Sequence, residues 1–74
     1  MNYEYSKILG KNLSSIRQAK GLTQEQLSAK LQVAGCDITR SALAKIEVGQ
    51  RHLYPDELKA LKKVLEIQYE DLFV

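Results

Sequence analysis

The chain has 74 residues, of which 45% are apolar and 27% charged, and its net charge is +2. These values are ordinary for a small globular domain, and no apolar run approaches the roughly 20 residues of a membrane-spanning helix. One cysteine, Cys36, excludes an internal disulfide, and a single histidine, His52, without clustered ligands argues against catalytic or metal chemistry.

From these totals we expect one domain over residues 1–74 that is not an enzyme and holds no cofactor, metal or small-molecule ligand. Cys36 is expected to be a turn or core residue and His52 a loop residue. The lack of a signal peptide and the cysteine usage favour a cytoplasmic location, outside any membrane. A chain this short buries only about 60% of the surface it exposes when unfolded, so self-association is expected.

The charge is unevenly distributed along the chain. Residues 1–54 hold eight Lys and Arg against four Asp and Glu, whereas residues 55–74 hold three against five. This asymmetry places any surface for a polyanion in the first two-thirds of the chain.

The first expected helix runs from Tyr5 to Lys20, after a frayed end at residues 1–4. Its apolar residues recur at spacings of four and three, the period of an amphipathic helix: Leu9, Leu13 and Ile16. Gly21 is expected to end it. Gly10 costs up to about 1 kcal/mol relative to alanine inside a helix, so a close neighbour is expected to need its space.

The second expected helix starts with a capping box, in which Thr23 is the N-cap and Gln26 the third helical residue. It carries Leu27, Leu31 and Val33 toward the core. The four residues Ala34-Gly35-Cys36-Asp37 break the period and form a turn, and Ile38 is expected to plug into the core.

The stretch from Thr39 to Glu47 predicts a third helix with two different faces. Its apolar stripe consists of Ala42, Leu43 and Ile46, and its other side carries small and basic residues without an acid: Arg40, Ser41, Ala44 and Lys45. Thr39 suits the N-cap, and Gly49 follows the end, where positive φ is favoured. Because a major groove accepts a short helix of this kind, we interpret it as a DNA recognition helix.

A polar loop over residues 49–53 leads to a fourth helix that begins at Pro55, with acidic residues in its first turn. Leu58, Leu61 and Leu65 form its inward face. A final turn over Tyr69–Phe73 completes five short helices without a strand pattern. The chain is therefore expected to be an all-α domain.

Several segments in order resemble the lambda-repressor-like helix-turn-helix family, also called the Cro/repressor or XRE type. They are Leu9-Gly10-Lys11, Leu22-Thr23-Gln24-Glu25-Gln26-Leu27, Ala44-Lys45-Ile46-Glu47-Val48-Gly49-Gln50-Arg51, and the closing set Leu58, Leu61, Leu65, Leu72 and Phe73. The resemblance implies a compact five-helix DNA-binding domain with the helix-turn-helix at its second and third helices.

Two departures from the family pattern stand out. The connection from Leu31 to Arg40 is longer than in the commonest members, which affects the pose of the third helix. Lys62 and Glu66 occupy positions where the family usually has Ala and Gly, so the fourth helix is expected to run further before it turns.

The resemblance also implies roles for individual residues. Bases would be read by Arg40, Ser41, Ala44 and Lys45. Phosphates would be contacted by Gln24, Thr39, Gln50, Arg51 and Lys11. Arg17 and Glu47 would form a structural ion pair between the first and third helices. The alternative is that Arg40, Lys45 and Gln24 are merely solvated.

The function that follows is sequence-specific transcriptional regulation, in this family usually repression, on double-stranded DNA. A homodimer would bind a two-fold operator, with its interface around the C-terminal helix at Tyr69, Leu72, Phe73 and Val74. In the alternative, Leu72 and Phe73 simply close the monomer core. The competing function is a protein-interaction module, such as an antitoxin-like or accessory subunit, which the low net charge and the altered connection favour.

Overall fold

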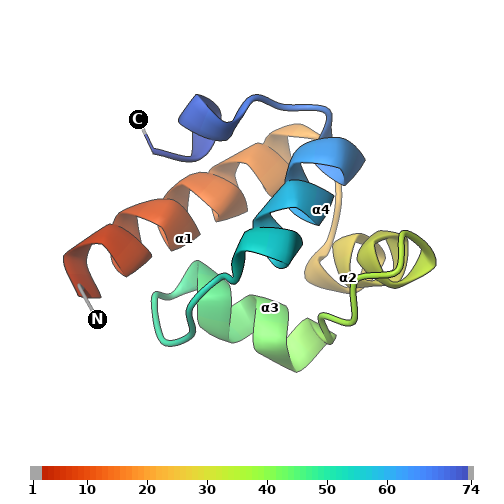
Figure 1. Ribbon diagram of the computed structural model, residues 1–74, viewed down its shortest axis with the longest axis horizontal. Helices are drawn as coiled ribbons and strands as arrows, with labels where there is room; N and C mark the ends of the chain where they lie inside the picture. The colour runs from red at the N-terminus through yellow and green to blue at the C-terminus, as the bar shows by residue number, and fades with distance from the viewer. Residues whose placement is uncertain (1–2, 74) are drawn as a thin grey trace.

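The computed structural model describes residues 3–73, and in this part of the chain it contains helices and no strand. The elements are α1 (Tyr3–Ala19), α2 (Gln24–Val33), α3 (Arg40–Glu47), α4 (Pro55–Leu65) and the 3-10 helix η1 (Tyr69–Leu72). In Figure 1, α4 lies across the centre of the molecule, with α3 below it and α2 to the right. The expected all-α class is confirmed, except that the fifth helix is a short 3-10 turn.

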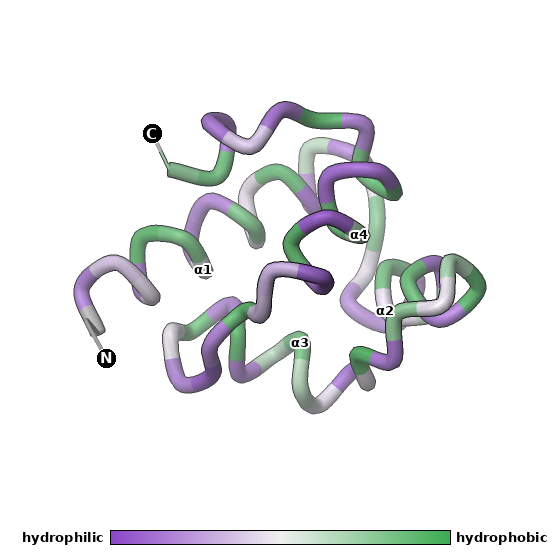
Figure 2. The backbone as a smooth tube through the Cα atoms, in the orientation of Figure 1, coloured by the Kyte–Doolittle hydropathy of each residue, from purple (hydrophilic) through white to green (hydrophobic). Residues whose placement is uncertain are grey.

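The core is built from nine leucine and isoleucine side chains, each at most 1% exposed. They come from all five helices and the turn before α3: Leu13, Leu27, Leu31, Ile38, Leu43, Ile46, Leu61, Leu65 and Leu72. Figure 2 shows hydrophobic and hydrophilic positions alternating along the helices. Each amphipathic helix thus has a stripe that it can bury only against the others. None of the helices in residues 3–73 is long and apolar enough to span a membrane.

α1 packs closely on the end of α3 at Gly10. A Cβ atom added to Gly10 would overlap the carbonyl oxygen of Ile46 and lie 2.7 Å from that of Glu47. The close neighbour expected at this glycine is therefore the backbone of α3. The helix itself begins at Tyr3 rather than at Tyr5, so only residues 1–2 of the expected frayed end lie outside the described residues.

α2 begins with the expected capping box. The Thr23 hydroxyl accepts a hydrogen bond from the Gln26 backbone N–H at 3.1 Å, and the Gln26 side chain accepts one from the Thr23 N–H at 2.9 Å. At its other end the sequence expectation is wrong, because Val33 is 90% exposed rather than buried. Val33, the last residue of α2, follows Leu31 by two residues and therefore lies about 200° around the helix, on the face opposite the buried one.

Several hydrogen bonds tie the connection between α2 and α3 to α2, two of which come from the middle of α2 and the turn. The Cys36 backbone N–H donates to the carbonyl of Leu31 at 2.8 Å, and the Ser28 hydroxyl donates to that of Ile38 at 2.7 Å. Ile38 fills the core as expected. Cys36 is half-buried, and this burial raises the pKa of its thiol. The longer connection is thus a fixed part of the fold.

The C-terminal part differs from expectation in two ways. α4 does not run further than usual but ends at Leu65, because Glu66 adopts the left-handed conformation with φ of 57°. Leu72 is fully buried, and its carbonyl accepts a hydrogen bond of 2.9 Å from the Asn12 side chain on α1. Leu72 therefore closes the monomer core, whereas Phe73 is 54% exposed.

Replacing Glu66 with glycine is expected to raise the free energy of unfolding by about 1 kcal/mol, because glycine adopts positive φ without a steric penalty. Urea unfolding followed by circular dichroism measures the change. Glu66→Ala keeps the Cβ and is the matched control. An equal gain in Glu66→Ala would mean that charge, not backbone strain, limits stability at this position.

Candidate nucleic-acid interface

α3 presents one face to the core and the other to the surface. Leu43 and Ile46 are buried, while Arg40, Ser41 and Lys45 are exposed. The Thr39 hydroxyl accepts a hydrogen bond of 3.1 Å from the Ala42 backbone N–H, as expected of an N-cap. The outward face is therefore short, basic and free of acidic side chains.

Ala44, the fourth residue expected to read bases, lies deeper than the other three. Its side chain is half-buried, between the exposed outer face and the core side of α3. Only part of this methyl group is open to another molecule.

The position of α3 is set by an ion pair with α1. Arg17 donates to the Glu47 carboxylate from Nε at 2.7 Å and from Nη2 at 3.1 Å. Its Nη1 donates to the carbonyl of Leu22 at 2.7 Å. Both partners are about 9% exposed, so the two charges are largely removed from water and stabilise each other. The structure thus brings together the two residues expected to link these helices.

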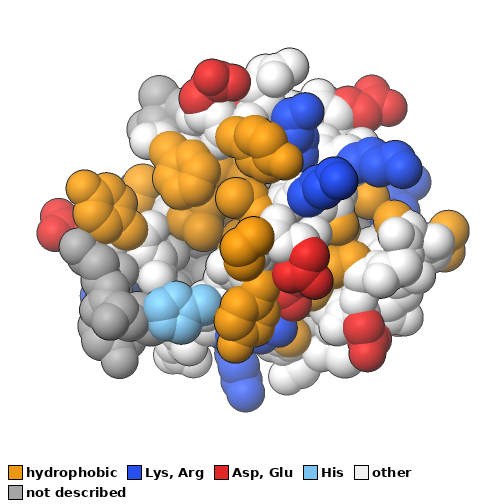
Figure 3. Space-filling model, in the orientation of Figure 1, with side chains coloured by type: hydrophobic (Ala, Val, Ile, Leu, Met, Phe, Trp, Pro, Cys, Tyr) orange, Lys and Arg blue, Asp and Glu red, His pale blue; other side chains and the backbone are white. Residues whose placement is uncertain are grey.

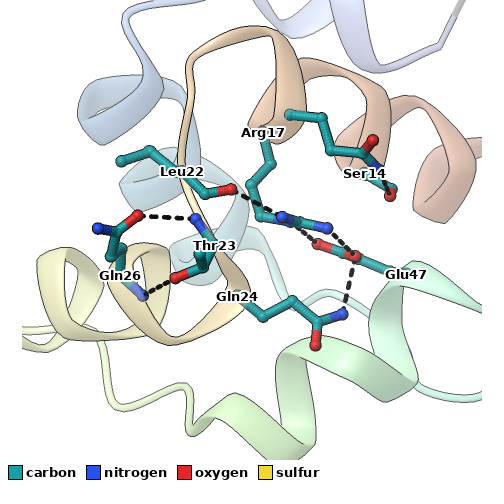
Figure 4. A network of polar contacts seen from close by, with 8 residues as sticks. Ser14, Arg17, Leu22, Thr23, Gln24, Gln26 and Glu47 are labelled. Atoms are coloured by element: carbon teal, nitrogen blue, oxygen red, sulfur yellow. Dashed lines mark hydrogen bonds and ion pairs between the residues drawn. The ribbon is translucent and has the colours of Figure 1, made fainter.

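Gln24 extends this network to the first turn of α2. Its side-chain amide donates to Glu47 Oε1 at 3.0 Å. Figure 4 shows the Glu47 carboxylate held between Arg17 from α1 and Gln24 from α2. An amide nitrogen has two hydrogens, so Gln24 keeps one for a second acceptor. The residue expected to contact phosphate therefore also has an internal structural role.

Gln24 and Arg40 line the same shallow hollow, between the start of α2 and the start of α3. Arg17, Leu22, Thr23 and Glu25 complete its lining. The start of a helix such as α2 favours an anion through its free N–H groups and its dipole. The hollow therefore joins a cationic side chain of α3 to a helix terminus suited to phosphate.

Arg51, another residue expected to contact phosphate, is engaged inside the molecule. Its Nη1 and Nη2 donate to the Glu57 carboxylate at 3.0 and 2.9 Å, and Nη1 also donates to the carbonyl of His52 at 2.9 Å. The guanidinium lies 5.7 Å from the ring centre of Tyr54. The hydrogen bonds from Arg51 hold the pKa of Glu57 below its ordinary value. The charge of Arg51 is therefore compensated.

The remaining candidates lie at the surface, and the structure adds a residue that the sequence reasoning missed. Lys11 and Gln50 are exposed. The added residue is Lys7, which is also exposed and packs on Gly49: a Cβ there would lie 2.8 Å from Lys7 Cγ. Lys7 precedes Lys11 by one helical turn. The four-residue spacing of Lys7 and Lys11, on either side of Gly10, could have indicated from the sequence that Lys7 lies near Lys11.

A family model described as helix-turn-helix matches residues 13–72. Among solved structures, the chain is similar to the restriction-modification controller protein C.AhdI from Aeromonas hydrophila. The TM-score is 0.83, with 32% sequence identity over 96% of each chain. A search of curated proteins gave no match. Both likenesses span α2, the connection and α3.

Arg17→Ala or Glu47→Ala is expected to lower the free energy of unfolding by about 3–5 kcal/mol, because each leaves a buried charge without its partner. Arg51→Ala is the matched control. The Arg51 side chain is 29% exposed against 11% for Arg17, and without Arg51 the Glu57 carboxylate still accepts a hydrogen bond from the Tyr54 backbone N–H, so the loss should be smaller. Chemical unfolding of the three variants measures these losses. Similar losses for Arg17→Ala and Arg51→Ala would contradict the structural role of the α1–α3 pair.

Proposed function

The chain belongs to the XRE-type helix-turn-helix family of DNA-binding transcription regulators, and from this premise we propose that it represses transcription from a two-fold operator. The observation that carries the proposal is the orientation of α3. Its apolar side is buried, its basic side is exposed, and the Arg17–Glu47 pair holds it in place. Repression by occupancy requires only tight and specific binding of such a helix in the major groove.

In the proposed complex, side chains on the outer face of α3 read base edges. The Arg40 guanidinium offers two parallel donors to O6 and N7 of guanine, and the Lys45 ammonium offers a single charged donor. Ser41 can donate or accept a hydrogen bond. The exposed part of the Ala44 methyl suits contact with a thymine methyl.

Phosphate contacts would fix the register of α3 without reading sequence. Gln24 and Thr39, at the starts of α2 and α3, and Gln50, after α3, supply polar contacts. Lys11 and Lys7 on α1 supply charge. We assign Arg51 a smaller part than the sequence alone suggests, because Glu57 already holds its guanidinium.

We also propose that two copies associate through an apolar band on the face drawn in Figure 3. There, hydrophobic side chains extend from the first turns of α1 across the C-terminal segment. The exposed large hydrophobic residues of these two segments are Tyr5, Ile8, Tyr69 and Phe73. Leu72 is not available because it is in the core, and Val74 lies outside the described residues. Burial of such a band would supply the main driving force for association.

The dimensions of the molecule suit this arrangement. Its principal extents are 30, 21 and 20 Å, and two recognition helices on a two-fold operator lie about 34 Å apart. Two copies side by side therefore have centres roughly 20 to 30 Å apart, which is the same order of distance as one turn of DNA. The similarity to C.AhdI leads us to propose control of a restriction-modification system as the biological setting.

On an operator selected from a random DNA pool, Arg40→Ala is expected to weaken binding by about 1–3 kcal/mol and to relax one base preference. Lys11→Ala should weaken binding to cognate and scrambled DNA alike and lower the salt slope by about 1. Arg51→Ala is the control with a compensated charge and should change that slope less. Fluorescence anisotropy at several salt concentrations measures all three.

Two results would contradict this assignment. If Arg40→Ala weakened binding to cognate and scrambled DNA equally, Arg40 would contact a phosphate rather than a base. If selection enriched no motif, the competing function as a protein-interaction module would be favoured instead.

Phe73→Glu is expected to raise the dissociation constant of the dimer at least about tenfold, because it places a charge in the centre of an apolar interface. Sedimentation velocity measures the change. Val33→Glu is the matched control, since it makes the same kind of substitution at an exposed position on α2, outside the band. An unchanged constant in Phe73→Glu, or an equal change in both variants, would reject this interface.

A further inference from the structure

Two adjoining hollows lie between α2 and the last turns of α4. The larger, of about 460 Å³, is lined by Ala29, Lys30, Val33 and Val64. The smaller, of about 200 Å³, shares Lys30 and Val64 and extends to Lys20, after the end of α1, and to Glu66. Together they form one shallow groove, called here the basic trough. Among its lining residues, Leu22 also borders the hollow beside Gln24 and Arg40, and none is assigned a contact with DNA or with the second copy.

The floor of the basic trough is aliphatic. Val33, with 90% of its surface exposed, is the most exposed large hydrophobic residue in residues 4–73, the part of the chain whose burial the structure describes. A single exposed valine is unremarkable on a protein surface. Here, however, Val33 borders the same hollow as Ala29 and Val64, and the smaller hollow adds the half-buried Leu22. A ligand with aliphatic side chains could therefore bury several apolar groups at once.

The rim of the basic trough is cationic. Lys20 and Lys30 are both exposed. The ion pairs between described residues are Arg17–Glu47 and Arg51–Glu57, so neither lysine is neutralised by a carboxylate. Glu66 is the single acidic residue of the lining. The charge of the rim is complementary to an acidic ligand.

We propose that the basic trough binds an acidic, aliphatic segment of a partner protein, which lays its apolar side chains on Val33 and Val64. A helix with one apolar face is a common ligand for such a groove. Nucleic acid is a poorer match for this lining. The trough has no aromatic side chain on which a base could stack, and no Arg, Asn or Gln to read a base edge.

The trough can be occupied while DNA is bound. Its lining contains no residue of α3. On α2 it lies around Val33, at the opposite end of the helix from Gln24, the residue assigned to phosphate. The partner would therefore be held beside the operator, and the regulator would act through this second protein as well as through occupancy.

The test uses the full chain with labelled methyl groups and a synthetic amphipathic peptide with leucines on one face and glutamates on the other. The expected result is a saturable change in the methyl resonances of Ala29, Val33 and Val64. Lys30→Glu should weaken binding about fivefold or more, since it reverses a rim charge. Lys59→Glu makes the same change of charge outside the trough and should have less than about a twofold effect.

Control ligands distinguish an acidic peptide from the other possible ligands of the trough. A peptide with lysines in place of the glutamates, or serines in place of the leucines, should leave the methyl resonances unchanged, and so should duplex DNA of scrambled sequence. The proposal is overturned if the acidic peptide causes no change, or if the lysine peptide binds equally well. It is also overturned if DNA alone, or a higher concentration of the protein alone, shifts the same methyl groups. The last two results would identify nucleic acid or a second copy as the occupant.

Discussion

The arrangement of the helices depends on the hydrogen bonds that the buried Glu47 carboxylate accepts from α1 and α2. A helix of eight residues such as α3 is not stable by itself in water, so its position must come from its neighbours. Glu47 is buried at the end of α3 and needs compensating donors, which Arg17 supplies from α1 and Gln24 from α2. Gly10 lets α1 approach the backbone at the same place. Together these contacts fix the orientation of the outer face of α3.

The basic residues are divided among different tasks, which net charge alone does not reveal. Arg17 and Arg51 are held by carboxylates within the molecule. Arg40 and Lys45 remain exposed on α3, while Lys20 and Lys30 border the basic trough on another side. A modest excess of positive charge can thus support both a surface for DNA and a separate surface for an acidic partner, because the lysines and arginines outside these neutral pairs lie in separate places.

Sequence reasoning predicted those features that local patterns determine. The capping box at Thr23, the buried stripe of α3 and the need for space at Gly10 all follow from spacing and backbone chemistry. Val33 was misjudged because it lies about 200° around the helix from Leu31, outside the i, i+4 stripe, and Glu66 because periodicity does not tell which residue accepts positive φ. The engagement of Arg51 and the placement of Lys7 depend on contacts across loops and between helices, which single-sequence patterns do not contain.

Because α3 has separate outer and inner faces, the DNA target of such a regulator can change while its fold stays the same. Arg40, Ser41 and Lys45 are exposed, whereas the contacts that hold the helix come from Leu43, Ile46 and Glu47. Substitutions at exposed positions usually have little effect on stability. Duplicated copies could therefore acquire new DNA targets by drift at a few outward positions while inheriting an unaltered scaffold.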